Sequence, residues 1–190
     1  MGVWNQKGDP ELVISAEPGG REPAPGELRR VQQFVNTNDR EGGDDRLASR
    51  PVLADWFRLW TQWPDCGIAT VEEHERALQV REGIRDLAGG NSSGESRLSP
   101  VLDTLDIRLV MQGGRLCLDS ANRLGKALSP ILDTVRAAMD DGTWARMKVC
   151  SRDRCRWLYY DSSRNGSAKW CATSVCGSRE KARRAYWRKK

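Results

Sequence analysis

Apolar residues recur every three or four positions over much of the first three quarters of the chain, which is the spacing of amphipathic helices. A first helix is predicted to begin near Leu28, and a second follows Ser49 and Pro51, residue types that suit a helix start. A third follows Thr70, where Thr70 and Glu73 have the spacing of a capping box. Residues 1–27 are instead rich in Gly, Pro and Glu, which indicates a weakly ordered leader.

A strict alternation of apolar and polar residues replaces the helical pattern in IRLVMQ-GG-RLCLDS, which predicts a β-hairpin. Ser129 and Pro130 then suit the start of a further helix, which ends before Gly142. Beyond Gly142, RMKVC and RWLYYD indicate two short strands, and the last twenty residues indicate a helix. Gly142 is therefore the expected boundary between two parts of the chain.

The charges are unevenly distributed along the 190 residues. The whole chain carries 31 Lys and Arg against 26 Asp and Glu, a net charge of +5. Residues 145–190 hold 14 of these basic residues and 3 of the acidic ones, which leaves the rest of the chain acidic. Such asymmetry points to a module that binds a polyanion, most commonly nucleic acid.

The sequence carries no pattern of a membrane or secreted protein. No stretch approaches the roughly 18 consecutive apolar residues of a membrane helix. The first residues lack the basic region and the apolar block of a secretory signal. We therefore expect no membrane association and a reducing cytoplasm, where clustered cysteines are more often metal ligands than disulfides.

Cysteines form the pattern C-x4-C-x15-C-x4-C within the basic segment, at Cys150, Cys155, Cys171 and Cys176. Such pairs suit tetrahedral Zn²⁺, because one turn presents two sulfurs to the ion. A segment of about 45 residues is too small for an adequate apolar core, and bound zinc would stabilise it. Two disulfides or four separate buried thiols are the alternatives. With sulfur at all four positions, one zinc ion per chain would be structural and not catalytic.

These patterns predict an α+β fold that is mostly helical. Residues 28–143 would form a helical domain with a β-hairpin, and residues 144–190 a small zinc-binding ββα-like module with a basic C-terminal helix. Cys66 and Cys117 lie outside that module. Cys117 is expected to be a small buried apolar residue or a redox-sensitive thiol.

The segment around the four cysteines resembles the CGNR zinc finger family. That family carries a C-R-W-L-F-Y-D-x-S-R-N pattern and takes its name from Cys-Gly-Asn-Arg at the fourth ligand. Here the first pattern reads CRWLYYDSSRN from Cys155 to Asn165, and the second reads CGSR, with Ser178 in the place of the asparagine. Serine and asparagine both cap helices, so the same backbone is expected.

Upstream of this finger, VQQFVNTND, LADWF and ERALQVREGIRDL are similar to the helical ABATE domain that commonly precedes it. Together the two parts resemble bacterial proteins described as stress-induced transcription regulators. The resemblance implies regulation of transcription through DNA, and residues 1–27 lie outside it.

The basic C-terminal helix is the main candidate for contact with a partner. On a helical wheel, Ala182, Ala185 and Tyr186 share an arc that would seat the helix on the zinc module, and cations cover the rest. Such a helix fits the major groove of DNA, where arginine matches phosphates and guanine edges. A solvated end that only aids solubility is the alternative. The predicted DNA contacts are Arg156, Arg164, Lys169, Arg179, Lys181, Arg183, Arg184 and Arg188.

The helical domain offers a weaker candidate site for a small-molecule effector. Asn36 and Thr37 follow an apolar run, and Arg81 and Arg85 lie one helical turn apart, where they would clamp an anion. The commoner roles of such residues are a helix end and surface ion pairs.

Tryptophans at positions 56, 60 and 63 recur at helical spacing, which is typical of a core or a dimer interface. Regulators that read palindromic sites are usually dimers, so a homodimer is expected.

The sequence shows no recognisable catalytic set: the only histidine, His74, has no nucleophile near it, and no Gly-rich phosphate loop occurs. The sequence therefore favours a non-enzymatic, zinc-dependent regulator that binds duplex DNA at the nucleoid. A zinc-stabilised RNA- or protein-interaction module without a specific operator is the main alternative.

Overall fold

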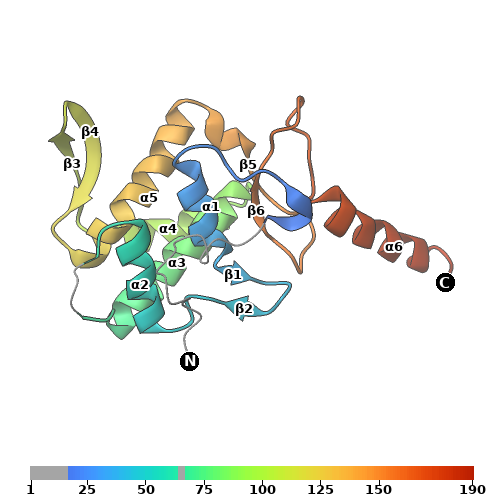
Figure 1. Cartoon of the computed structure of the whole chain (residues 1–190), viewed down its shortest axis with the longest axis horizontal. Helices are drawn as coiled ribbons and strands as arrows, with labels where there is room; N and C mark the ends of the chain where they lie inside the picture. The colour runs from blue at the N-terminus through green and yellow to red at the C-terminus, as the bar shows by residue number, and fades with distance from the viewer. Residues whose placement is uncertain (1–16, 64–66) are drawn as a thin grey trace.

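The computed structural model describes residues 17–63 and 67–190 and has the expected α+β, mostly helical architecture (Figure 1). Residues 1–16 of the predicted leader and Cys66 lie outside the described part of the chain. The helices are α1 (Leu28–Asn36), α2 (Arg50–Trp60), α3 (Val71–Ala88), α4 (Ser93–Leu102), α5 (Arg123–Asp140) and α6 (Ser178–Trp187). The short helical turns are η2 (Pro18–Gly20), η3 (Thr143–Arg146) and η4 (Thr173–Gly177).

Within residues 17–63 and 67–190, the strands pair as three antiparallel hairpins. These are β1 (Asn38–Asp39) with β2 (Asp44–Asp45), β3 (Ile107–Gln112) with β4 (Arg115–Ser120), and β5 (Met147–Val149) with β6 (Leu158–Tyr160). Among the described residues, no helix combines the length and the apolar composition that a membrane span requires.

Two predicted elements form with the residues that the sequence indicated. At the start of α3, the Thr70 hydroxyl accepts a hydrogen bond from the Glu73 amide at 3.1 Å, and the Glu73 carboxylate accepts one from the Thr70 amide at 2.7 Å. Between β3 and β4, Gly113 and Gly114 have φ angles of 57° and 77°, which the tight turn requires. The capping box and the two-glycine hairpin are therefore confirmed.

The start of α5 differs from the prediction. The helix begins at Arg123, upstream of Ser129 and Pro130, which lie inside it. The Asn122 side chain accepts hydrogen bonds from two amides of the first turn, at 2.9 and 3.2 Å. The predicted boundary is wrong because Asn122 and not Ser129 is the cap.

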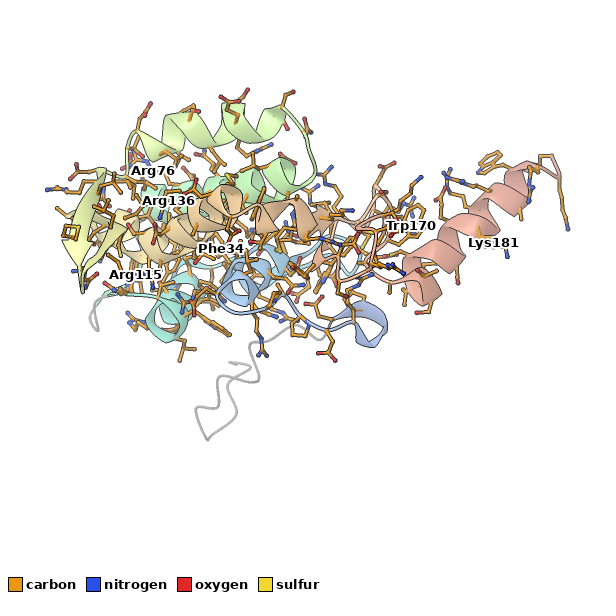
Figure 2. All side chains as sticks on the ribbon, turned by 90° about the horizontal axis from the view of Figure 1, so that it is seen from above. Phe34, Arg76, Arg115, Arg136, Trp170 and Lys181 are labelled. Carbon is orange, nitrogen blue, oxygen red and sulfur yellow. The ribbon has the colours of Figure 1, made fainter. Side chains whose placement is uncertain are left out.

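Aromatic side chains fill the core between α1 and α2. Phe34 is fully buried and contacts Trp56 and Phe57, with ring centroids 5.2 and 6.1 Å apart. Trp60 stacks on Trp56, and Trp63 stacks on Phe57. Figure 2 places Phe34 in the middle of the main body. The tryptophan stripe therefore packs into the core, and only Trp60 is half-buried.

The β5–β6 hairpin shares this core with the helical domain. Met147 and Leu158 are buried among the apolar side chains of the helices. The Asn36 side chain donates to the Leu158 carbonyl at 2.8 Å and accepts from its amide at 2.9 Å. Gln32 donates to the same carbonyl at 3.3 Å. The segments on either side of Gly142 are thus held together by apolar packing and by hydrogen bonds to one strand.

The β3–β4 hairpin and α6 lie at opposite ends of the molecule (Figure 1). The hairpin turns an apolar face to the solvent: Leu109, Met111 and Leu116 are each at least 60% exposed. Met111 is paired directly with Leu116 across the strands, so these side chains share a face. Cys117 is half-buried on the other face of β4.

Candidate metal centre and nucleic-acid interface

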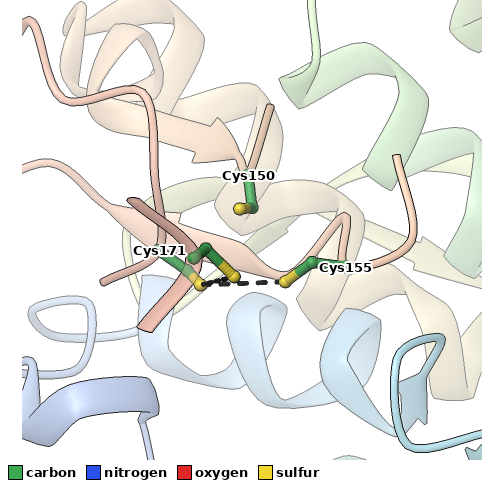
Figure 3. A group of neighbouring side chains, drawn as sticks. Cys150, Cys155 and Cys171 are labelled. Carbon is green, nitrogen blue, oxygen red and sulfur yellow. Dashed lines mark hydrogen bonds between the residues drawn. The ribbon is translucent and has the colours of Figure 1, made fainter. Parts of the chain in front are cut away.

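The four predicted zinc ligands come together between β5 and α6, where Cys150, Cys155, Cys171 and Cys176 are all buried (Figure 3). Their sulfur atoms lie within 4.8 Å of one another, and neighbouring sulfurs are 3.6 and 3.7 Å apart. Four sulfurs at about 2.3 Å from one zinc ion would be separated by about 3.8 Å. A disulfide would instead need a separation of about 2.05 Å. The donor set and its spacing fit one structural Zn²⁺, which these four cysteines would hold.

Local backbone hydrogen bonds position the first two ligands. The Cys155 amide donates to the Arg152 carbonyl at 2.8 Å, which closes a tight turn between the two cysteines. The Cys150 amide donates to the Trp157 carbonyl at 2.9 Å, which joins the two strands at the base of that turn. Arg156 has a left-handed φ of 48° and redirects the chain into β6. The spacing of the first two cysteines therefore corresponds to one turn that brings both sulfurs to the same centre.

A buried aspartate, absent from the predicted site residues, organises the loop that follows β6. Asp161 is fully buried and accepts hydrogen bonds from the Ser163 amide at 3.1 Å and the Ala168 amide at 2.9 Å. The Lys148 ammonium donates to the same carboxylate at 2.9 Å. Burial alone would raise the pKa of Asp161, but these partners hold it well below its usual range. The sequence signal was an aspartate two residues before a serine, which is typical of an Asx turn.

Arg21 packs against the zinc finger, although the sequence assigned it to a weakly ordered leader. Its guanidinium donates to the carbonyls of Tyr160, Trp170 and Cys171 at 3.1, 3.2 and 2.5 Å. It also lies over the ring of Tyr159, 4.6 Å from the centroid. Arg21 therefore bridges β6 and the segment that carries the third ligand.

Glu17 makes a second contact between this leader and the finger. Its carboxylate accepts a hydrogen bond from the Trp157 indole at 3.0 Å. Burial raises the pKa of Glu17 to about 7, against the opposing effects of that hydrogen bond and of the Arg21 and Arg29 charges. Residues 17–21 are thus part of the surroundings of the zinc site.

Glu41, in the turn between β1 and β2, connects the helical domain to cations beside the zinc site. Its carboxylate pairs with Arg152 and, at 2.7 Å, with Arg179. One of its oxygens lies 3.9 Å from the Cys176 sulfur. Arg179 still exposes 52% of its side chain, so its charge remains accessible from outside.

The last helix, α6, extends away from the rest of the molecule (Figures 1 and 2). The prediction that Ala182, Ala185 and Tyr186 would seat it on the zinc module is wrong, because Ala182 is exposed, Ala185 is only half-buried and Tyr186 is 56% exposed. The helix continues directly from η4, and its first turn buries Glu180. Ser178 does not cap the helix; its hydroxyl donates to the Thr173 carbonyl at 3.3 Å.

Most of the predicted DNA contacts are exposed cations. Arg183 and Arg184 expose 63% and 70% of their side chains and pair with Glu180. The hydrogen bond from Arg183, together with that from Arg184, lowers the pKa of Glu180 to about 2 against the opposing effect of burial. Further exposed candidates are Lys181 on α6, Arg188 directly after it, and Arg164 and Lys169 on the loop before the third ligand.

Arg156 differs from the other predicted DNA contacts. Its guanidinium donates to the Asp86 carboxylate at 2.8 Å, and its carbonyl accepts from Arg85 at 2.7 Å. The side chain is only 26% exposed. In the structure, Arg156 therefore joins the zinc finger to α3.

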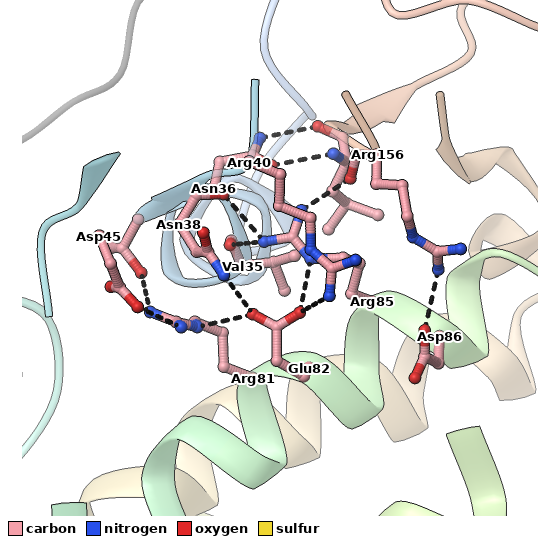
Figure 4. Close-up of polar contacts among 12 residues, drawn as sticks. Val35, Asn36, Asn38, Arg40, Asp45, Arg81, Glu82, Arg85, Asp86 and Arg156 are labelled. Carbon is pink, nitrogen blue, oxygen red and sulfur yellow. Dashed lines mark hydrogen bonds and ion pairs between the residues drawn. The ribbon is translucent and has the colours of Figure 1, made fainter. Parts of the chain in front are cut away.

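The predicted effector residues do come together, but inside a largely buried network (Figure 4). We call this network the joint; it consists of Asn36, Thr37, Asp45, Arg81, Glu82, Arg85, Asp86 and Arg156. Arg81 is 2% exposed and forms a two-point pair with Asp45, both distances being 2.7 Å. Arg85 is fully buried and donates to the carbonyls of Val35 and Asn38 at 2.6 and 3.1 Å.

Glu82 supplies the negative charge at the centre of the joint. Its carboxylate accepts hydrogen bonds from Asn38, Arg81 and Arg85 at 3.0–3.1 Å. Burial alone would raise the pKa of Glu82, but the charge of Arg85, the hydrogen bond from Asn38 and the charges of Arg81 and Arg40 lower it to about 2. The predicted effector residues are thus engaged by protein groups, and they form no open site for an anion.

Comparison with known families agrees with this architecture. Residues 146–189 match the CGNR zinc finger. Residues 28–140 match the ABATE family, described as "Putative stress-induced transcription regulator". A search of curated proteins found no match. Neither family description names an enzymatic activity, and both predicted resemblances are confirmed. Since the second match covers more than half of the chain, this protein belongs to the ABATE family and carries a CGNR zinc finger after that domain.

Proposed function

We propose that this protein is a zinc-dependent transcription regulator whose zinc finger and α6 bind duplex DNA. In this proposal, zinc fixes the start of α6, which is too short to be stable alone, and the helix presents its cations to the phosphates and base edges. The protein is expected to act in the cytoplasm, at the nucleoid.

The observation that carries this proposal is the exposure of the cations on a projecting helix. Arg183 and Arg184 are exposed over most of their length, in contrast to the buried arginines of the joint. A helix of about 10–12 Å diameter that stands clear of the body can enter a major groove about 12 Å wide. Arg164 and Lys169, on the loop beside it, are also exposed to reach flanking phosphates.

The experiment measures binding of the zinc-loaded chain to a labelled duplex by fluorescence anisotropy over a series of salt concentrations. The double variant Arg183→Ala/Arg184→Ala should weaken binding. It should also reduce the slope of the logarithm of the binding constant against the logarithm of the salt concentration, by roughly 0.9 for each phosphate that the variant no longer neutralises. The matched control is Arg108→Ala/Arg115→Ala, which removes the same charge from the hairpin at the opposite end of the molecule. Equal weakening in both variants, or unchanged binding in the first, would exclude α6 as the binding surface.

The main alternative is a module that binds RNA or another protein without a specific operator. Duplexes selected from genomic fragments separate the two. An operator-binding protein keeps a preference of at least about a thousandfold for its site over random duplex at physiological salt, whereas a general polyanion binder loses it.

The helical domain takes two roles in this proposal. It holds the zinc finger through the joint, and it mediates homodimer formation through the exposed apolar face of the β3–β4 hairpin. The three outward-facing side chains, Leu109, Met111 and Leu116, support this because two copies of one apolar patch can meet about a two-fold axis. Analytical ultracentrifugation of the full chain tests homodimer formation, and Met111→Glu should shift the measured mass toward that of the monomer.

Because the predicted effector residues are paired with other groups of the protein, the proposal includes no effector at that position.

A further inference from the structure

An open groove lies between α6 and the segment that carries the third zinc ligand. Gly177 and two tryptophans, Trp170 and Trp187, contribute to its lining. The cations that line it are Lys181, Arg183, Arg184 and Arg188, and the Glu180 carboxylate lies among them. Figure 2 shows Trp170 on the zinc finger beside the start of α6, with Lys181 further along the helix. The groove thus combines aromatic rings with positive charge.

The zinc-finger side of this groove is fixed by packing. Trp170 is half-buried against the cysteine cluster, and its carbonyl accepts a hydrogen bond from Arg21 at 3.2 Å. A Cβ atom at Gly177 would lie 3.1 Å from Cδ1 of Trp170, so glycine at this position allows the indole to approach the backbone at the start of α6. The ring therefore holds its position before any ligand arrives.

The opposite side of the groove is lined by Trp187, which does not pack into an apolar core. Trp187, in the last turn of α6, is 61% exposed. Within the described chain its ring contacts are Tyr186, 5.5 Å away and edge-on, and the Lys190 ammonium. A large aromatic side chain with this degree of exposure, on a helix rich in exposed cations, is typical of a contact surface.

We propose, on the basis of the proposed function, that this groove receives one unpaired base of a DNA strand. The exposed Trp187 indole would stack on one face of the base, and Lys181 and Arg188 would bind the adjoining phosphates. Phosphate contacts alone need only the cations, and a paired base offers only its edges to a groove-binding protein. An indole can stack on the face of a base only when the base leaves the duplex stack. The preferred partner is therefore a duplex with a bulged or flipped nucleotide, or a junction with single-stranded DNA.

The test compares two labelled DNAs with the zinc-loaded full chain: a perfect duplex, and the same duplex with one extra unpaired nucleotide. Stacking of one base should strengthen binding to the bulged duplex by about 5- to 150-fold. Trp187→Leu should abolish that preference while leaving affinity for the perfect duplex and its salt dependence unchanged. Arg188→Ala should weaken binding to both DNAs.

The matched control is Tyr186→Leu, which removes a neighbouring exposed aromatic ring that does not line the groove. This variant should keep the preference for the bulged duplex. Equal binding of both DNAs by the unsubstituted chain would overturn the inference but leave the proposed function standing. A preference that survives in Trp187→Leu would also overturn it, and failure to bind either DNA would overturn both proposals.

Discussion

Arginines occupy two contrasting regions of this protein, the joint around α3 and the projecting helix α6. In the joint, Arg81 and Arg85 are at most 2% exposed, and each donates to several oxygens of the chain itself. On α6, Arg183 and Arg184 are mostly exposed and share a single carboxylate. The two pairs also differ in spacing: residues 81 and 85 lie one turn apart, and residues 183 and 184 are adjacent.

The difference shows how one residue type serves opposite purposes. A buried guanidinium whose donors are satisfied within the protein fixes two segments relative to each other, because any movement would leave a charge unpaired in a low-dielectric interior. An exposed guanidinium contributes little to stability but remains free to exchange its partner for a phosphate. The joint is therefore a structural feature, and α6 is the surface on which binding is expected.

The largest effect that would test this contrast is removal of the zinc. Cys171→Ser should release the ion, whose binding to such a site is worth about 10–16 kcal/mol, and α6 with β5 and β6 should lose their order. Because Asn36 and Arg85 would then be without their partners on the finger, the melting temperature of the remaining helices should also fall. Zinc content and circular dichroism melting measure both changes.

The control for this prediction is Cys117→Ser, which replaces a half-buried thiol on the distant β3–β4 hairpin. It should retain zinc and the full melting temperature. A Cys171→Ser protein that released zinc but kept an ordered α6 would contradict the role given to the metal. Unchanged melting of the helical domain would contradict the coupling through the joint.

The zinc ligands and the main elements were predictable because their signals are local. Two cysteines separated by four residues define one turn, and the capping box of Thr70 and Glu73 spans a single helical turn. The hairpin was also set by adjacent residues, with two glycines between alternating strands. Each of these features depends on the chemistry of a few neighbouring positions.

The joint and the contacts between the leader and the zinc finger could not be predicted, because both join distant parts of the chain. Asn36 bonds to Leu158 across 122 positions, and Arg21 bonds to Cys171 across 150. The spacing of Arg81 and Arg85 shows that they share a helix face, but not whether that face is buried. Arg156 belongs to a run of cations in the sequence, and only the fold directs it to Asp86.

The second prediction compares one arginine from each region. Arg85→Met should lower the free energy of unfolding by about 3–5 kcal/mol, because it removes one cationic partner of Glu82 and leaves the Val35 and Asn38 carbonyls without their Arg85 donor. Arg184→Ala should change it by no more than about 0.5 kcal/mol. Urea denaturation of both variants, with zinc bound, measures the difference. If both variants lost the same unfolding free energy, the burial of the joint would not explain why its arginines stabilise the fold more than those of α6.

The third and smallest effect concerns the two glutamates that these arginines bind. The pKa values of Glu82 and Glu180 both lie near 2 in the folded protein, below the ordinary value of 4.5. A lowered carboxyl pKa stabilises the fold above about pH 4.5, and that stability is lost as the pH falls toward 2. For Glu82, whose side chain is 15% exposed, the contribution is about 3 kcal/mol.

Glu180 should contribute far less than its lowered pKa suggests, because its partners are exposed arginines whose charges water and salt screen. Glu82→Gln should therefore destabilise the protein at pH 7 and flatten the acid limb of its stability profile, whereas Glu180→Gln should leave both nearly unchanged. Thermal melting between pH 3 and 7 at two salt concentrations measures this. A Glu180→Gln profile that matched the Glu82→Gln profile would mean that α6 is held by its ion pairs as firmly as the joint, and is not free to exchange them for DNA phosphates.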